Sequence, residues 1–241
     1  MNIDCRNLWK EAFGDTDEFL DVFSATAYSA QRTNRVEIDG KTVAALYWFD
    51  CEYKGKKIAY IYAVATAEAY RGQGLCHKLM RKTHRLLQEK GYAGTMLVPG
   101  GQDLATLYAD MGYVPCTCIG NVSVSARGGT DCVPIDKREY AMLRRQMLPP
   151  CAVIQEGENL DFLEKQAQFY CGDGFVLAAR KEGNKLIGLE LLGDTEKAAA
   201  IVGSLGCALG EFRVPNGNIP FAMGLFFEPM PKPVYFGLVF D

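Results

Sequence analysis

The sequence predicts an α/β (α+β) chain, in which a mixed, mainly antiparallel sheet is flanked by helices and a smaller α+β module follows. Two hairpin signals and one amphipathic helix lead to this prediction. Apolar runs meet at Asp39-Gly40, a strong turn pair, and a second Lys/Gly turn lies over residues 53–57. Over residues 74–90 the leucines form one apolar stripe and Gly91 follows as a stop signal, which predicts a helix packed on the sheet.

The remaining elements of this first part follow in order. Residues 6–30 are predicted to be helical because apolar side chains recur there at near-helical spacing. Residues 57–66 are predicted as a strand, 95–99 as a short strand, 103–111 as a short helix ending at Gly112, and 113–125 as a final strand region.

A domain boundary is expected at Leu148-Pro149-Pro150, where a helix cannot continue. It divides the chain into residues 1–148 and a module at 151–241, which holds 7 Lys and Arg against 12 Asp and Glu. The module opens with an apparent amphipathic helix at 159–170 and a hairpin about Gly183-Asn184, which repeats the order of residues 15–50. Either it is a diverged second copy of the same module, or it is an unrelated small α+β unit.

Composition excludes several classes of protein. Apolar residues make up 49% of the 241, charged residues 23%, and the net charge is −3, values ordinary for a globular protein. No basic block or nucleic-acid motif is present, so we expect no nucleic-acid partner. No apolar run has the length of a signal peptide or membrane span, so we expect no membrane association. Nine scattered cysteines without a second close pair or nearby histidine indicate reduced thiols in a cytoplasm and no metal site.

The most informative segment joins the strand over 57–66 to the helix over 74–90. Between them stands Arg71-Gly72-Gln73-Gly74. Free N–H groups at a helix N-terminus form an anion site, and glycines let the backbone approach a phosphate. A P-loop is excluded because GxxxxGK[ST] is absent, and a Rossmann fingerprint because its third glycine is missing.

This segment resembles the GNAT superfamily of acyl-CoA-dependent N-acetyltransferases. The signature [RQ]-x-x-G-x-[GA] is read as residues 71–76, with Cys76 in place of the usual glycine or alanine. The upstream Val64-Ala65-Thr66 and the downstream Leu107-Tyr108-Ala-Asp-Met-Gly112-Tyr113 are similar to the family's flanking elements. The resemblance covers residues 8–125 and implies the GNAT sheet.

The resemblance also implies roles for individual residues. The strand at Val64–Thr66 is expected to separate from its neighbour, so that the pantetheine arm of acetyl-CoA pairs with its backbone and the Val64 amide stabilises the oxyanion. Tyr108 is expected to be the general acid that protonates the departing thiolate; the alternative is a tyrosine that only packs. The predicted cofactor site consists of Val64, Ala65, Thr66, Arg71, Gly72, Gln73, Gly74, Leu75, Cys76 and His77.

The sequence does not identify the general base. No carboxylate lies on the strands at 57–66 and 94–101. The candidates are a water chain or one of the carboxyl groups of Glu37, Glu68, Asp103 and the C-terminal Asp241.

Other reactive or aromatic residues receive ordinary interpretations. His77 and His84 are too few for a metal site. Cys76 at a helix N-terminus is expected to have a lowered pKa, without covalent catalysis. The run Tyr47-Trp48-Phe49 either packs in the core or lines the acceptor cleft, and Asn216-Gly217 is predicted as a turn.

The sequence therefore predicts an N-acetyltransferase that moves an acetyl group from acetyl-CoA to an amine of a small molecule or protein. The alternative is a GNAT-like module that binds CoA or a metabolite as a sensor and catalyses nothing; a weaker idea is transfer of a longer acyl chain. The C-terminal module is expected to shape the acceptor side of the cleft or to form an oligomer contact, such as that of a homodimer.

Overall fold

The computed structural model describes residues 1–240, and the chain divides into two compact units. Unit 1 comprises Met1–Val114 and Met223–Pro231, and unit 2 comprises Pro115–Ala222 together with the segment from Lys232 onward. The expected boundary at Pro149-Pro150 is therefore wrong. Residues just after 115 already pair within the second sheet, and the two prolines follow a helix that packs on that same sheet.

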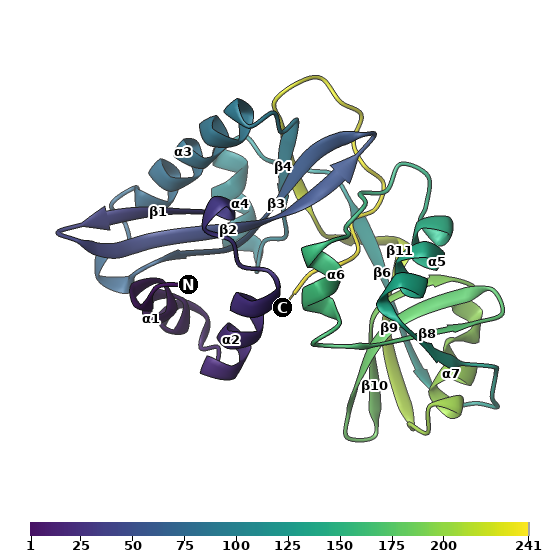
Figure 1. The fold of residues 1–241 in the computed structure, drawn as a ribbon. Helices are drawn as coiled ribbons and strands as arrows, with labels where there is room; N and C mark the ends of the chain where they lie inside the picture. The colour runs from purple at the N-terminus through teal and green to yellow at the C-terminus, as the bar shows by residue number, and fades with distance from the viewer. Residues whose placement is uncertain (241) are drawn as a thin grey trace. The chain divides into compact units, whose positions relative to one another are not determined.

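Unit 1 is a sheet of six strands in the order β1-β2-β3-β4-β12-β5, of which Figure 1 labels β1 to β4. Its ladders are antiparallel between β1 and β2, β2 and β3, and β4 and β12, whereas β3 and β4 are parallel. The strands are β1 (Thr33–Ile38), β2 (Lys41–Tyr53), β3 (Lys56–Thr66), β4 (Gly94–Leu97), β5 (Val114–Pro115) and β12 (Met223–Phe226).

Both expected hairpins of unit 1 are present. Asp39 and Gly40 join β1 to β2 with φ of 50° and 77°, and Lys54 and Gly55 join β2 to β3 with φ of 51° and 73°. Two consecutive residues with positive φ form the turn whose twist matches that of antiparallel strands. The glycine in each pair supplies the second of these conformations without a steric penalty.

Helices cover both faces of this sheet. On one face α3 (Leu75–Glu89) packs its buried side chains against Ala44, Leu46 and Trp48 of β2. On the other face α1 (Ile3–Phe13) and α2 (Asp17–Thr26) pack Trp9 and Phe23 against Tyr47. The run Tyr47-Trp48-Phe49 is thus core on both faces because successive strand residues point in opposite directions. The shorter helices are η1 (Ala30–Arg32), η2 (Glu68–Tyr70) and α4 (Gln102–Asp110).

The single helix expected over 6–30 is two helices. Gly14 ends α1 with φ 74°, and its N–H donates to the carbonyl of Lys10. Thr16 then begins α2, because its side chain accepts a hydrogen bond from the N–H of Phe19. A glycine stop followed two residues later by a threonine cap makes a continuous helix unfavourable here.

Unit 2 repeats the strand pattern of unit 1. Its order is β6-β11-β10-β9-β8-β7, with β10 and β11 parallel and the other neighbours antiparallel. The series β8, β9, β10, β11, β6 therefore has the same sequence of strand directions as β1, β2, β3, β4, β12. The strands are β6 (Cys118–Ser125), β7 (Val133–Ile135), β8 (Gln168–Gly172), β9 (Phe175–Glu182), β10 (Lys185–Gly193) and β11 (Leu209–Pro220).

Two expectations for unit 2 are wrong. The helix expected over 159–170 ends early as α6 (Glu158–Leu163), and Gln168–Tyr170 instead pair with β9 as part of β8. Asn216-Gly217 is no turn: Asn216 has φ 63° within β11, where the register with β6 shifts between Val214 and Ile219. The extra residues form an irregularity in one long strand. The other helices are α5 (Lys137–Met147), η3 (Thr195–Lys197) and α7 (Ala198–Ser204).

Unit 2 contains a buried ion pair at its centre. Arg144 of α5 and Glu190 of β10 are 1% and 0% exposed, and two guanidinium nitrogens donate to the two carboxylate oxygens at 2.6 and 3.0 Å. The hydroxyls of Tyr140 and Tyr235 also donate to Glu190, at 2.8 and 3.2 Å. Each carboxylate oxygen of Glu190 thus accepts two hydrogen bonds. These bonds replace the water that burial removes and make the buried charge tolerable.

Removing one member of this pair should be costly. We expect Arg144→Met to lower the free energy of unfolding by about 3–5 kcal/mol, because it leaves Glu190 buried without its counter-ion. The matched control is the neighbouring Arg145→Met, which breaks an exposed pair with Glu156 and should cost about 1 kcal/mol or less. Urea unfolding of both variants measures the difference; equal losses would contradict this account of the core.

Candidate functional site

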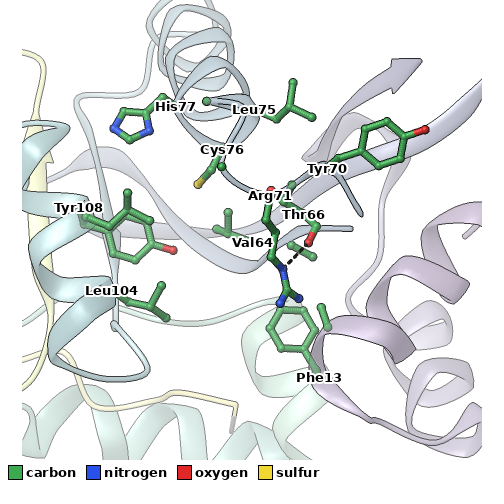
Figure 2. Close-up of a pocket in the computed structure, with 15 residues that line it drawn as sticks. Phe13, Val64, Thr66, Tyr70, Arg71, Leu75, Cys76, His77, Leu104 and Tyr108 are labelled. Atoms are coloured by element: carbon green, nitrogen blue, oxygen red, sulfur yellow. Dashed lines mark hydrogen bonds between the residues drawn. The ribbon is translucent and has the colours of Figure 1, made fainter. Parts of the chain in front are cut away.

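A cavity of about 610 Å³ opens at the end of β3 in unit 1. Side chains from five places enclose it: the end of α1, the end of β3, the turn after η2, the start of α3 and one face of α4 (Figure 2). Its lining consists of Ala12, Phe13, Val64, Ala65, Thr66, Tyr70, Arg71, Gly72, Gly74, Leu75, Cys76, His77, Leu104, Leu107 and Tyr108.

The structure brings all but one of the predicted site residues together at this cavity. Gln73 is the exception: it is exposed, does not line the cavity, and its side-chain amide donates to the carbonyl of Ala69 at 3.4 Å. Tyr108 of α4, Cys76 of α3 and Val64 of β3 point into the same space (Figure 2). Residues more than 40 positions apart in sequence thus line one cavity.

The cavity exists because β3 and β4 separate. Their ladder contains three pairs and stops at Tyr60 opposite Met96, although β3 continues to Thr66. Ala63 has φ 49°, and the register with β2 shifts there, so that Tyr47 pairs with Tyr62 but Ala45 pairs with Ala65. A bulge bends its strand, and this one turns Val64–Thr66 away from β4.

The glycine turn begins α3 without a side-chain cap. Gly72 and Gly74 have φ of 73° and 72°, a conformation that favours glycine, and Gly74 is the N-cap residue. No side chain accepts from the first amides of α3. These N–H groups have no partner within the helix, and the helix dipole is positive at this end, so the turn is built to receive an anion.

Arg71 adds a positive charge beside this turn. Its Nε donates to the carbonyl of Thr66 at 3.2 Å, which fixes the side chain along the end of β3. None of the residues that line the cavity is an aspartate or glutamate. The electrostatic character of the site is therefore positive, which suits a phosphorylated ligand.

Tyr108 stands on the opposite wall. It is 6% exposed, its ring contacts that of Tyr113 edge to face with centroids 5.8 Å apart, and burial raises the pKa of its hydroxyl above the ordinary value. The hydroxyl therefore keeps its proton at neutral pH. A side chain must hold a proton to donate one, so the environment of Tyr108 is compatible with the role of an acid.

Cys76 differs from the expectation for its pKa. It lines the cavity at the start of α3, yet burial raises the pKa of its thiol. Burial removes the thiolate from water and so disfavours the charged form. A protonated thiol is a poor nucleophile, and the absence of covalent catalysis by Cys76 stays a prediction.

The carboxylates named as bases lie elsewhere. Glu37, Glu68 and Asp103 are exposed and none lines the cavity; Glu37 pairs with Arg35, with 2.6 Å between nitrogen and oxygen. Asp241 lies outside the described residues. None of these three carboxylates is therefore placed to take a proton inside the cavity.

The histidines have separate roles. His77 lines the cavity. His84 lies beside Tyr113, and its Nε2 shares a 2.9 Å hydrogen bond with the Tyr113 hydroxyl. Burial lowers the pKa of His84 to about 4, so the ring is neutral at physiological pH. Within residues 1–240 no three histidine, cysteine, aspartate or glutamate side chains are grouped as a metal site, and no helix has the length and apolarity to cross a membrane.

Sequence reasoning missed five lining residues: Ala12, Phe13, Tyr70, Leu104 and Leu107. Part of the signal was available. Leu104, Leu107 and Tyr108 are spaced i, i+3, i+4, so a helix that carries Tyr108 into a site carries the leucines with it. Phe13 gave no such signal, because its place depends on how the end of α1 meets β3; its side chain remains 47% exposed at the cavity.

Solved structures of similar fold are numerous. A GCN5-related N-acetyltransferase from Kribbella flavida matches with a TM-score of 0.72 and 16% identity over 92% of this chain and 68% of its own. A putative acetyltransferase from Pyrococcus horikoshii matches with a TM-score of 0.63 and 14% identity over 98% and 90%. A tandem GNAT protein from the clavulanic acid biosynthesis pathway matches with a TM-score of 0.55 and 10% identity over 94% and 95%.

These similarities show the fold. Comparison of the sequence with curated proteins gives no match. The family model described as an acetyltransferase (GNAT) domain matches residues 3–116, the segment that contains the glycine turn, the bulged strand and Tyr108. Residues 3–116 of this chain thus match the GNAT acetyltransferase domain, and its fold is that of solved GNAT proteins.

Proposed function

We propose that the chain transfers an acetyl group from acetyl-CoA to an amine of a small molecule or protein. The observation that supports this most is the cavity itself. It joins an anion-binding turn at one end to a buried, protonated tyrosine at the other, along a strand that has left its neighbour.

In this proposal acetyl-CoA lies along β3. The amides of the turn at Gly72–His77 and the charge of Arg71 bind the pyrophosphate, and the backbone of Val64–Thr66 pairs with the amides of the pantetheine arm as an added strand would. The fit rests on three features described above: an uncapped helix N-terminus, a lining free of carboxylates and a strand segment without a neighbour in the β4 direction.

The chemistry then needs two proton transfers. The amine nitrogen attacks the thioester carbonyl, the C–N bond forms and the C–S bond breaks. Tyr108 donates its hydroxyl proton to the departing sulfur, the proton released by the amine passes to water, and the Val64 amide stabilises the oxyanion.

Burial explains why the sulfur requires a proton in this place. Burial raises the pKa of the Cys76 thiol, and the same surroundings disfavour any thiolate formed beside it. A departing thiolate of CoA is therefore poorly stabilised here. Protonation by Tyr108 during cleavage avoids that charge and gives the hydroxyl a catalytic purpose.

The test measures release of the CoA thiol with a colorimetric thiol reagent, over a panel of primary amines and lysine peptides. Mass spectrometry identifies the amide product. We expect at least one acceptor to release thiol in equal amount to amide. The competing function is a sensor that binds CoA only, which the absence of a carboxylate from the cavity lining favours. Tight acetyl-CoA binding with no thiol release above the buffer rate for any acceptor would decide for the sensor.

Cys76 provides an independent probe of where the ligand lies. Because its side chain lines the cavity, bound CoA should shield it from alkylation by iodoacetamide at alkaline pH, where some thiolate forms. Peptide mapping reads this directly, and the exposed Cys118 and Cys151 of unit 2 are internal controls that should label equally with and without CoA. Equal labelling of Cys76 in both conditions would place CoA elsewhere.

A further inference from the structure

Unit 2 has the same strand separation that makes the cavity of unit 1. The strands β10 and β11 pair from Lys185 opposite Leu209 to Gly188 opposite Phe212, and β10 then continues to Gly193 without that neighbour. The register of β10 with β9 also shifts, between Gly188 and Glu190. A bulged strand leaving its parallel partner is the construction already seen at β3.

In unit 2 the chain itself occupies this place. The tail, defined as residues 232–240, contacts both strands immediately beyond their last pair. On the side of β10, the Tyr235 hydroxyl donates to Glu190 at 3.2 Å. On the side of β11, Arg213 donates to the carbonyl of Gly237 at 3.2 Å.

The tail is bound in the manner of an extended peptide. Its backbone exchanges hydrogen bonds with residues 151–153: Val153 N–H donates to Tyr235 at 2.9 Å, and Val234 N–H donates to Cys151 at 3.1 Å. The side-chain amide of Gln155, itself buried, continues the ladder by donating to and accepting from the backbone of Leu238, at 2.6 and 2.9 Å. Main-chain pairing of this kind is a recurrent mode of peptide recognition.

Side chains complete the recognition. The aromatic and aliphatic side chains of Tyr235, Phe236, Leu238, Val239 and Phe240 are buried, and the Phe240 ring meets that of Phe162 on α6 with centroids 5.1 Å apart. At Gly237 a Cβ atom would stand 2.2 Å from Glu190 Oε1. A side chain at this position would have to displace the buried carboxylate of Glu190 or the ring of Tyr235, so the cleft favours glycine here.

The end that binds an anion in unit 1 is closed in unit 2. The segment after β10 has no glycine turn, and the Asp194 carboxylate accepts from the N–H of Glu196 at 3.1 Å. A fixed carboxylate here repels phosphate, and α7 has seven residues where α3 has fifteen.

We propose that unit 2 contains a peptide-binding cleft whose ligand is the chain's own tail, and that this unit takes no acyl-CoA. The tail satisfies Glu190 and Arg213 and fills the gap between β10 and β11, in the position where a cofactor arm would pair. The inference does not depend on acetyl transfer, because it concerns the occupant of a different unit.

The experiment uses the full chain with Gly237→Ala, which crowds the tail out of the cleft. A fluorescent peptide with the sequence of residues 232–241 should bind this variant saturably at one per chain, and at least tenfold more tightly than it binds the wild type, whose cleft is already filled. The control is Val234→Ala in the same tail, where the side chain is 53% exposed; it should behave as the wild type does. A folded Gly237→Ala variant that binds no peptide would overturn the proposal.

A second measurement needs no variant. The Val153 amide donates to the tail residue Tyr235, and the amide of the tail residue Leu238 donates to Gln155. In hydrogen exchange of the wild type, both amides should exchange at least tenfold faster than amides in the centre of β9, because the tail leaves before the unit unfolds. Equal rates would mean that the tail is an inseparable part of the core, and two bound CoA per chain would mean that the cleft is a cofactor site; either result overturns the inference. Acetyl transfer can fail without affecting these readouts.

Discussion

Replacing Tyr108 with phenylalanine is expected to lower kcat by about 10²- to 10⁴-fold and to leave the Kd of acetyl-CoA nearly unchanged. The substitution removes one hydroxyl and keeps the ring that lines the cavity and contacts Tyr113. If the hydroxyl donates its proton only as the C–S bond breaks, its loss affects the transition state and not the bound donor. Steady-state kinetics with saturating acceptor, together with calorimetry of acetyl-CoA, separates the two.

Tyr113→Phe is the matched control for this prediction. Its ring touches Tyr108, but its hydroxyl bonds to His84 at 2.9 Å and to Thr95 at 2.7 Å and does not line the cavity. We expect this variant to lose stability while keeping most of its kcat. An unchanged kcat in Tyr108→Phe, with cleavage shown to limit the rate, would assign Tyr108 to packing alone.

Gly74→Glu is expected to weaken acetyl-CoA binding at least about 100-fold, a loss on the order of 2.7 kcal/mol. The new carboxylate would stand at the N-cap of α3, where it would take the amides offered to the pyrophosphate and repel its charge. A non-glycine residue at φ 72° also strains the turn. Calorimetric titration with acetyl-CoA measures the effect.

Two variants distinguish charge from strain. Gly55→Glu places the same side chain at φ 73° in the turn between β2 and β3, away from the cavity, and should bind acetyl-CoA as the wild type does. Gly74→Ala imposes strain without charge and should fall between the two. If Gly74→Glu bound acetyl-CoA with wild-type affinity, the pyrophosphate would not bind at the start of α3.

Local signals made much of unit 1 predictable. The stripe of leucines and Gly91 predicted α3, and Asp39-Gly40 predicted the first hairpin, because each depends on residues close together in sequence. The glycine turn and its flanking residues identified much of the cavity lining in the same way. The helix expected through Gly14 shows the limit: apolar spacing continued across a residue whose positive φ ends α1.

Other features depend on residues distant in sequence. The segment at Gln168–Tyr170 has apolar spacing compatible with a helix, and pairing with β9 decides that it is a strand. Phe13 lines the cavity only because α1 ends beside β3. The division of the chain at residue 115 follows from pairing of β6 with β11, which a proline pair near residue 150 could not reveal.

The pairing of β12 with β4 has a consequence for how the protein is made. Residues 223–226 lie beside Gly94–Leu97 in the sheet of unit 1, although about half the chain separates them. As the nascent chain leaves the ribosome, β4 therefore presents an unpaired edge throughout synthesis of unit 2, and such edges invite association with other chains. The sheet of unit 1 is therefore closed only after residues 115–222, nearly all of unit 2, have been synthesised.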